Sequence, residues 1–158
     1  MYNDEPREDQ SWMCEKCFHS SKTKFETCPQ CGAVNSGFDI DDGMVEIVRE
    51  LNNKGYITIM CCEGHVDRQY TKTFKEVAIM FSFAEKYDFD FGGEWSPVGK
   101  NIWWNLMIVK RVPTKTKKQL NGNWKEELET WRQNKLEEIS AKVKDLPIIS
   151  QKERDANE

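Results

Sequence analysis

The apolar residues between positions 41 and 53 recur with the period of an α-helix. They occupy positions i, i+3, i+4 and i+7, which places them on one face of an amphipathic helix; they are Met44, Ile47, Val48 and Leu51. Acidic residues that can cap a helix stand at the start of the segment, and Gly55 follows its end. We therefore predict a helix over residues 41–53.

The middle of the chain contains segments whose patterns indicate β-strands. Residues 56–61 are short and rich in β-formers, and residues 76–83 alternate between large apolar side chains and others. Residues 101–112 are the most apolar stretch and have large side chains on both faces, which predicts a central strand covered on both sides. Residues 84–100 contain several glycines and Pro97, so we expect a loop there.

A long helix is predicted near the C-terminus. Asn123 can cap its first turn and Glu126 can reach back to the cap, as in a capping box. Apolar positions at the helical period then form one stripe: Trp124, Leu128, Trp131, Leu136, Ile139 and Val143. Pro147 ends the pattern. We therefore expect a helix over residues 124–145.

The first cysteines of the chain are spaced as metal ligands. Two Cys-x-x-Cys pairs are separated by ten residues, and they are Cys14, Cys17, Cys28 and Cys31. Each pair can offer two thiolates from one tight turn, and two such turns complete the four ligands of a tetrahedral zinc ion. Because no coordination position is left open, the sequence predicts one structural Zn²⁺ rather than a catalytic one.

The order of these elements predicts an α+β fold, with an N-terminal four-cysteine zinc ribbon followed by a small, mainly antiparallel sheet flanked by two helices. The predicted units are a flexible acidic tail (1–11), the zinc ribbon (12–36), the α+β domain (37–147) and a disordered tail (148–158).

Composition and charge disfavour two broad classes of function. The 23 Lys and Arg and the 27 Asp and Glu give a net charge of −4, the wrong sign for a protein that coats phosphate backbones, so direct nucleic-acid binding is not expected. The sequence contains no apolar run long enough to span a bilayer, and its first residues are acidic where a signal peptide would be basic. We therefore expect a cytoplasmic protein with no membrane partner.

The cysteine pairs, preceded by Trp12 and followed by Gly32, resemble short zinc ribbons and Ran-binding-protein-type fingers. RNA-binding members of that finger family carry an Asn where this chain has Ser21. The alternative to a protein-contact module is a regulatory protein that binds single-stranded RNA or DNA through Lys22, Lys24 and Phe25. The same alternative would use the basic concentration of the chain as a phosphate contact, namely Lys110, Arg111, Lys115, Lys117 and Lys118.

The sequence Cys-Cys-Glu-Gly-His at positions 61–65 is a second group of candidate ligands. Thiolate and imidazole both bind zinc, so Cys61, Cys62 and His65 predict a second metal site, completed by His19, Glu63, Asp67 or water. An enzyme would instead use a cysteine nucleophile activated by His65. In a third alternative, the thiols are small buried apolar groups and the histidine fixes a turn.

The segment from Leu51 to His65 looks like small proteins encoded by phages and mobile elements of Gram-positive bacteria. Together with the ribbon, the size and the acidic charge, it makes the chain similar to zinc-containing anti-CRISPR proteins that inhibit Cas9-type effectors. The resemblance implies a protein that is not an enzyme and that acts in the cytoplasm of a bacterial host. It further implies that the chain binds the effector nuclease and blocks its recognition of DNA.

The residues predicted to contact the partner lie in the segment 84–100, where carboxylates and aromatic side chains alternate. Cas9-type effectors hold nucleic acid in positively charged channels, so an acidic inhibitor can compete for the same surface. The predicted partner-binding residues are Glu85, Asp88, Asp90, Glu94 and Trp95. In the alternative interpretation, the segment is a solvated loop whose aromatic side chains cover an edge of the core.

Overall fold

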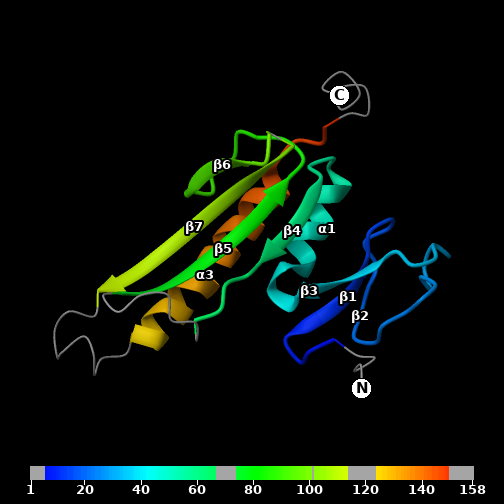
Figure 1. Ribbon diagram of the computed structural model, residues 1–158, viewed down its shortest axis with the longest axis horizontal. Coiled ribbons are helices and arrows are strands. Elements are labelled where there is room, and N and C mark those ends of the chain that lie inside the picture. The colour runs from blue at the N-terminus through cyan, green and yellow to red at the C-terminus, as the bar shows by residue number, and fades with distance from the viewer. Residues whose placement is uncertain (1–5, 67–73, 101, 114–123, 150–158) are drawn as a thin grey trace.

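The computed structural model describes residues 6–66, 74–100, 102–113 and 124–149 (Figure 1). Within these residues the chain forms two antiparallel sheets and two α-helices, which confirms the predicted α+β class. Four cysteines lie close together near the N-terminus, an arrangement compatible with a zinc ribbon. Positions 1–5 and 150–158 of the two predicted tails lie outside the described residues, and Gln10 and Ser11 of the first tail already belong to the first strand.

The smaller sheet contains the ribbon. Its strands are β1 (Gln10–Cys14), β2 (Ser20–Ser21) and β3 (Gly37–Asp41), in the order β2-β1-β3. β3 pairs with β1 along its whole length, from Gln10 opposite Asp41 to Cys14 opposite Gly37. The sheet therefore continues across the predicted boundary between residues 36 and 37, because the return strand of the ribbon comes after its last cysteine.

The larger sheet has the order β4-β5-β7-β6, with every neighbouring pair antiparallel. Its strands are β4 (Thr58–Cys62), β5 (Phe74–Phe83), β6 (Glu94–Val98) and β7 (Trp103–Pro113). β6 lies inside the segment for which the sequence predicts a loop. Pro97 is compatible with this strand because β6 is at the edge of the sheet, where an unpaired side needs no N–H donor.

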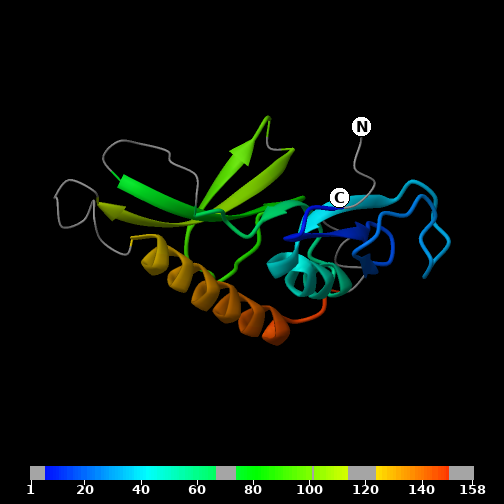
Figure 2. The same cartoon turned by 90° about the horizontal axis from the view of Figure 1, so that it is seen from below.

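Both helices cover one face of the larger sheet (Figure 2). The predicted helix 41–53 begins with a 3₁₀ turn, η1 (Asp42–Met44), and continues as α1 (Val45–Asn53). α3 (Trp124–Asp145) has the predicted bounds. The side chains that the two helices bury against the sheet are Ile47, Val48, Leu51, Leu128, Leu136, Ile139 and Val143. None of the described helices has both the length and the apolar character that crossing a membrane requires.

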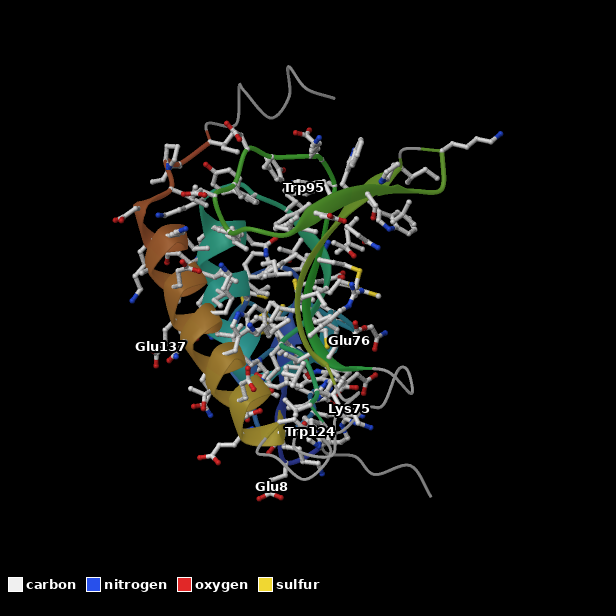
Figure 3. The ribbon with its side chains drawn as sticks, turned by 90° about the vertical axis from the view of Figure 1, so that its left-hand side faces the viewer. Glu8, Lys75, Glu76, Trp95, Trp124 and Glu137 are labelled. Carbon is white, nitrogen blue, oxygen red and sulfur yellow. The ribbon has the colours of Figure 1, made fainter. Side chains whose placement is uncertain are left out.

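The opposite face of the larger sheet is covered by no described helix or strand. Glu76 of β5 lies on this side, away from α3 (Figure 3). β7 presents Met107 and Val109 here, and their exposed fractions are 38% and 37%. The prediction that this strand is covered on both sides is therefore wrong. Its sequence is apolar on both faces, but only the face with Leu106 and Ile108 enters the core.

Candidate metal centre and contact surfaces

The two Cys-x-x-Cys turns have the same backbone geometry. In the first turn, the N–H of Phe18 donates to the carbonyl of Cys14 at 2.9 Å, and in the second, the N–H of Gly32 donates to that of Cys28 at 2.9 Å. Both residues that close the turns have positive φ, 62° for Phe18 and 78° for Gly32. The thiols of the two turns lie within 4.8 Å of one another.

The distances between the sulfur atoms match a shared metal ion. Cys14 Sγ and Cys31 Sγ are 3.8 Å apart, and Cys17 Sγ and Cys28 Sγ are 3.6 Å apart. A disulfide would require about 2.05 Å. Two thiolates at about 2.3 Å from a zinc ion and at the tetrahedral angle lie about 3.8 Å apart. The four cysteines are therefore placed so that they could hold one metal ion, as the sequence predicts.

Hydrogen-bond donors surround the thiol of Cys14. Burial opposes its ionisation, but the Ser36 hydroxyl at 3.0 Å and backbone N–H groups outweigh burial, and they lower the pKa of the Cys14 thiol to about 6. One of these N–H donors belongs to Lys16. Because the thiolate is the metal-binding form, these donors prepare the site for a cation.

The basic and aromatic residues of the ribbon are engaged within the chain. Lys22 Nζ donates to the carbonyls of Glu8 and Gln10 and pairs with Asp42 at 2.5 Å. The Lys24 ammonium lies 5.1 Å from the centroid of the Trp12 ring, and Phe25 packs edge-on against the same ring. The alternative of single-strand binding would require these contacts to open. Of the second basic group, Arg111 pairs with Glu76 at 2.8 Å, and positions 115, 117 and 118 lie outside the described residues.

Cys61 and Cys62 point to opposite faces of β4, since they are neighbours in a strand. Cys61 lies opposite Phe81 and packs against the core, where burial raises the pKa of its thiol to about 12. Cys62 lies opposite Met80, and its sulfur is grouped with His65 and with Asp41 of β3. The structure therefore brings together two of the three predicted ligands and separates the third.

The two described residues that were candidates to complete the second site, His19 and Glu63, have other partners. The His19 ring packs beside Phe25 in the ribbon. The Glu63 carboxylate accepts a hydrogen bond from the N–H of Gly43 at 2.8 Å and lies 3.5 Å from Arg132. Asp67 lies outside the described residues. Sequence reasoning misses Asp41, which the structure adds, because an acidic residue before a helix is typical of a cap, yet its side chain makes no cap hydrogen bond.

The predicted partner-binding residues do not form one surface. Asp88 and Asp90 are exposed and alternate with inward-facing aromatic rings, and Asp90 lies 3.5 Å from Lys142 on α3. Trp95 is half-buried within that aromatic group, 5.7 Å from Phe83 between ring centroids. Glu85 is partly buried at the start of the same loop. Glu94 is exposed and lies opposite Met107, on the uncovered face of the sheet.

A shallow hollow of about 620 Å³ lies beside Glu94 on this uncovered face. Its walls come from β5, β7 and the start of β6, and they comprise Glu76, Gly93, Glu94, Met107, Val109 and Arg111. The exposed apolar positions that follow one another along β7 are the signal that, in the sequence alone, predicts a buried strand. We call this surface, from Glu76 to Glu94 across Met107 and Val109, the open sheet face.

Comparisons with known proteins identify no relative of this chain. No protein-family model, no curated protein and no solved structure matches the chain.

Proposed function

We propose that the chain is a zinc-stabilised, non-catalytic binding protein that recognises a protein partner through its open sheet face. The observation that carries this proposal is the uncovered row of apolar side chains on β7, where Met107 and Val109 are more than a third exposed. Contiguous apolar surface of this kind marks interaction sites in soluble proteins. Methionine suits such a surface because its flexible thioether adapts to the shape of a partner.

The role of zinc in this proposal is structural. Four thiolates fill the coordination sphere, so no position is left for a substrate or an activated water. The ribbon sheet contributes few apolar side chains to the main core: Met13 and Ile40 are buried there, and Phe18 and Phe38 are partly buried against it. Metal binding would therefore supply much of the free energy that folds this part of the chain.

The charges around the open sheet face favour a basic partner. Glu94 is exposed at one edge and lies apart from the Glu76–Arg111 ion pair of the same hollow, and the whole chain carries a net charge of −4. Carboxylates around an apolar centre steer association with a Lys- and Arg-rich surface, while the apolar centre supplies the contact area. The nucleic-acid channel of a Cas9-type effector is such a surface, and the resemblance of segment 51–65 points to that partner.

Binding can be tested with a purified Cas9–guide complex from a Gram-positive bacterium, by biolayer interferometry and by cleavage of a matched DNA. Met107→Glu should weaken binding at least about tenfold, because it places a charge in the apolar centre of the contact. Ile148→Glu is the matched control, since Ile148 is also exposed but follows α3. Equal effects of the two variants would exclude the open sheet face as the contact surface.

The acidic contribution needs a separate pair of variants. Glu94→Lys should slow association, and the difference from the unmodified chain should shrink as salt is added. Glu137→Lys makes the same change of charge on the exposed side of α3, away from the open sheet face (Figure 3), and should have little effect. Absence of both binding and inhibition with effectors from several such bacteria would remove the effector as the partner.

A further inference from the structure

Asp41, Cys62 and His65 come together from two different sheets, and we propose that they bind a second Zn²⁺. Asp41 ends β3 of the ribbon sheet, Cys62 ends β4 of the larger sheet, and His65 follows in the connecting turn. One ligand atom from each side chain lies within 4.8 Å of the others. This inference is independent of the partner proposed above.

The spacing of the ligand atoms fits a bound metal better than a direct hydrogen bond. Asp41 Oδ2 and His65 Nε2 are 3.7 Å apart, which is too long for an N–H···O hydrogen bond. Two ligands about 2.1 Å from a zinc ion at the tetrahedral angle lie about 3.4 Å apart. A metal ion between the two atoms would thus require only a small adjustment of the side chains.

The carboxylate of Asp41 is buried and oriented by its neighbours. The residue is only 5% exposed, and among the described residues its one ion-pair partner within 4 Å is His65. Oδ1 accepts a hydrogen bond from the Gln10 side-chain amide at 3.2 Å, and Oδ2 accepts one from the backbone N–H of Glu63 at 3.0 Å. Hydrogen bonds that orient a ligand from outside are typical of metal sites, and a cation would offset the cost of burying this charge.

The backbone after β4 is shaped to return His65 to this position. Gly64 has a φ of 91°, a conformation that favours glycine, and it is buried. A Cβ at this residue would lie 2.6 Å from a methyl group of Val77 and 3.1 Å from the carbonyl oxygen of Ala78. Only glycine therefore allows the chain to pass this close to β5 before it reaches His65.

The donor set selects zinc. One thiolate, one imidazole and one carboxylate combine the soft and borderline ligands that zinc prefers, and the two anionic ligands balance the charge of the ion. The fourth position would be taken by water, since His65 also borders a hollow of about 380 Å³ that is open to solvent. Such an ion would connect the ribbon sheet to the larger sheet.

The number of zinc ions per chain tests the proposal. The full chain would be loaded with excess Zn²⁺, desalted and weighed by native mass spectrometry. We expect two zinc ions in the unmodified chain, one in His65→Ala and one in Cys62→Ala. Cys61→Ala is the matched control, because this neighbour faces the core, and it should keep two.

A Co²⁺ titration gives a second readout that does not depend on stability. The unmodified chain should take up two equivalents, of which the second shows weaker sulfur-to-cobalt charge transfer because it has one thiolate instead of four. His65→Ala should lack only this second phase and retain the first, which also shows that the ribbon is still folded. A single equivalent in the unmodified chain, or equal loss in Cys61→Ala and Cys62→Ala, would overturn the assignment.

Discussion

At the scale of single residues, the two Cys-x-x-Cys turns of the ribbon share one backbone conformation but use different residues to adopt it. The residue that closes each Cys-x-x-Cys turn has positive φ, which Gly32 adopts freely and which costs Phe18 about 1 kcal/mol. The Phe18 side chain packs against the main core, whereas Gly32 has no neighbour within 4 Å of an added Cβ. The first turn therefore also anchors the ribbon to the rest of the molecule, and the contact offsets the strained backbone.

Gly37 is required for a different reason, which leads to a prediction. A Cβ at this position would lie 1.8 Å from Trp12 Nε1, and that ring nitrogen donates a hydrogen bond to the Phe25 carbonyl at 3.2 Å. Gly37→Ala should displace the indole and lower the free energy of unfolding by about 2 kcal/mol, as overpacking does elsewhere. Urea unfolding, monitored by Trp fluorescence, would measure this decrease in the free energy of unfolding.

Gly32→Ala serves as the comparison for that experiment. It introduces backbone strain without a steric clash, so we expect a loss of only about 1 kcal/mol. A larger loss in Gly32→Ala than in Gly37→Ala would show that the Trp12 ring does not constrain β3.

At the scale of elements, α3 is attached to the rest of the domain at both ends. At its start, the Lys75 ammonium of β5 lies 5.2 Å from the centroid of the Trp124 ring, and the two side chains meet between the helix and the sheet (Figure 3). Beyond its end, Tyr56 donates its hydroxyl proton to the Pro147 carbonyl at 2.7 Å. These contacts hold the helix across strands that are distant in sequence, so that it covers a single face of the sheet.

Lys54 caps the end of α3. Its Nζ donates to the carbonyls of Val143, Lys144 and Leu146 at 2.8, 2.5 and 2.8 Å, where a helix has unpaired acceptors and a negative dipole end. Lys54→Met should lower the free energy of unfolding by about 2 kcal/mol, because it removes charge-assisted hydrogen bonds. Thermal unfolding would detect the change.

The exposed Lys144 provides a control for this substitution. Lys144→Met removes a cation from the same turn but leaves its own backbone carbonyl in place, so it should cost less than about 0.5 kcal/mol. If both variants are equally destabilised, any positive charge near the end of α3 has the same effect, and the hydrogen bonds from Lys54 to the helix carbonyls are not the source of the stabilisation.

At the scale of the whole molecule, two sheets with different sources of stability are joined through β3, η1 and α1. The larger sheet, α1 and α3 share a continuous apolar core, to which the ribbon sheet adds Met13 and Ile40, whereas the rest of the ribbon is built around four clustered thiols. We therefore expect loss of metal to affect the two parts unequally.

Removal of zinc with a chelator should disorder the ribbon while leaving most of the larger sheet folded. In ¹H–¹⁵N spectra, signals from residues 12–36 should collapse toward unfolded positions, while those from β5 and β7 should persist. Acidification should have the same effect as the chelator, since protons compete with zinc for the thiolates and zinc is released as the pH falls. Simultaneous loss of all signals would show that the two sheets fold as one cooperative unit.

Much of this organisation was predictable because it depends on local spacing. The ribbon cysteines follow from their two pairs, and α3 follows from one apolar stripe between a capping residue and a proline. β6 could not be predicted in the same way. Its few residues include Pro97 and follow two glycines, and only the neighbouring strand β7 makes this segment an edge strand.

The positions of the open sheet face and of the second candidate metal site depended on tertiary structure. β7 is apolar on both faces, and the sequence contains no information about which face the helices will cover. Likewise, the spacing of Cys62 and His65 is visible in the chain, but Asp41 reaches them only because β3 ends beside β4. Local patterns determine which groups a segment can offer, whereas contacts between distant segments determine which of those groups meet and which stay exposed.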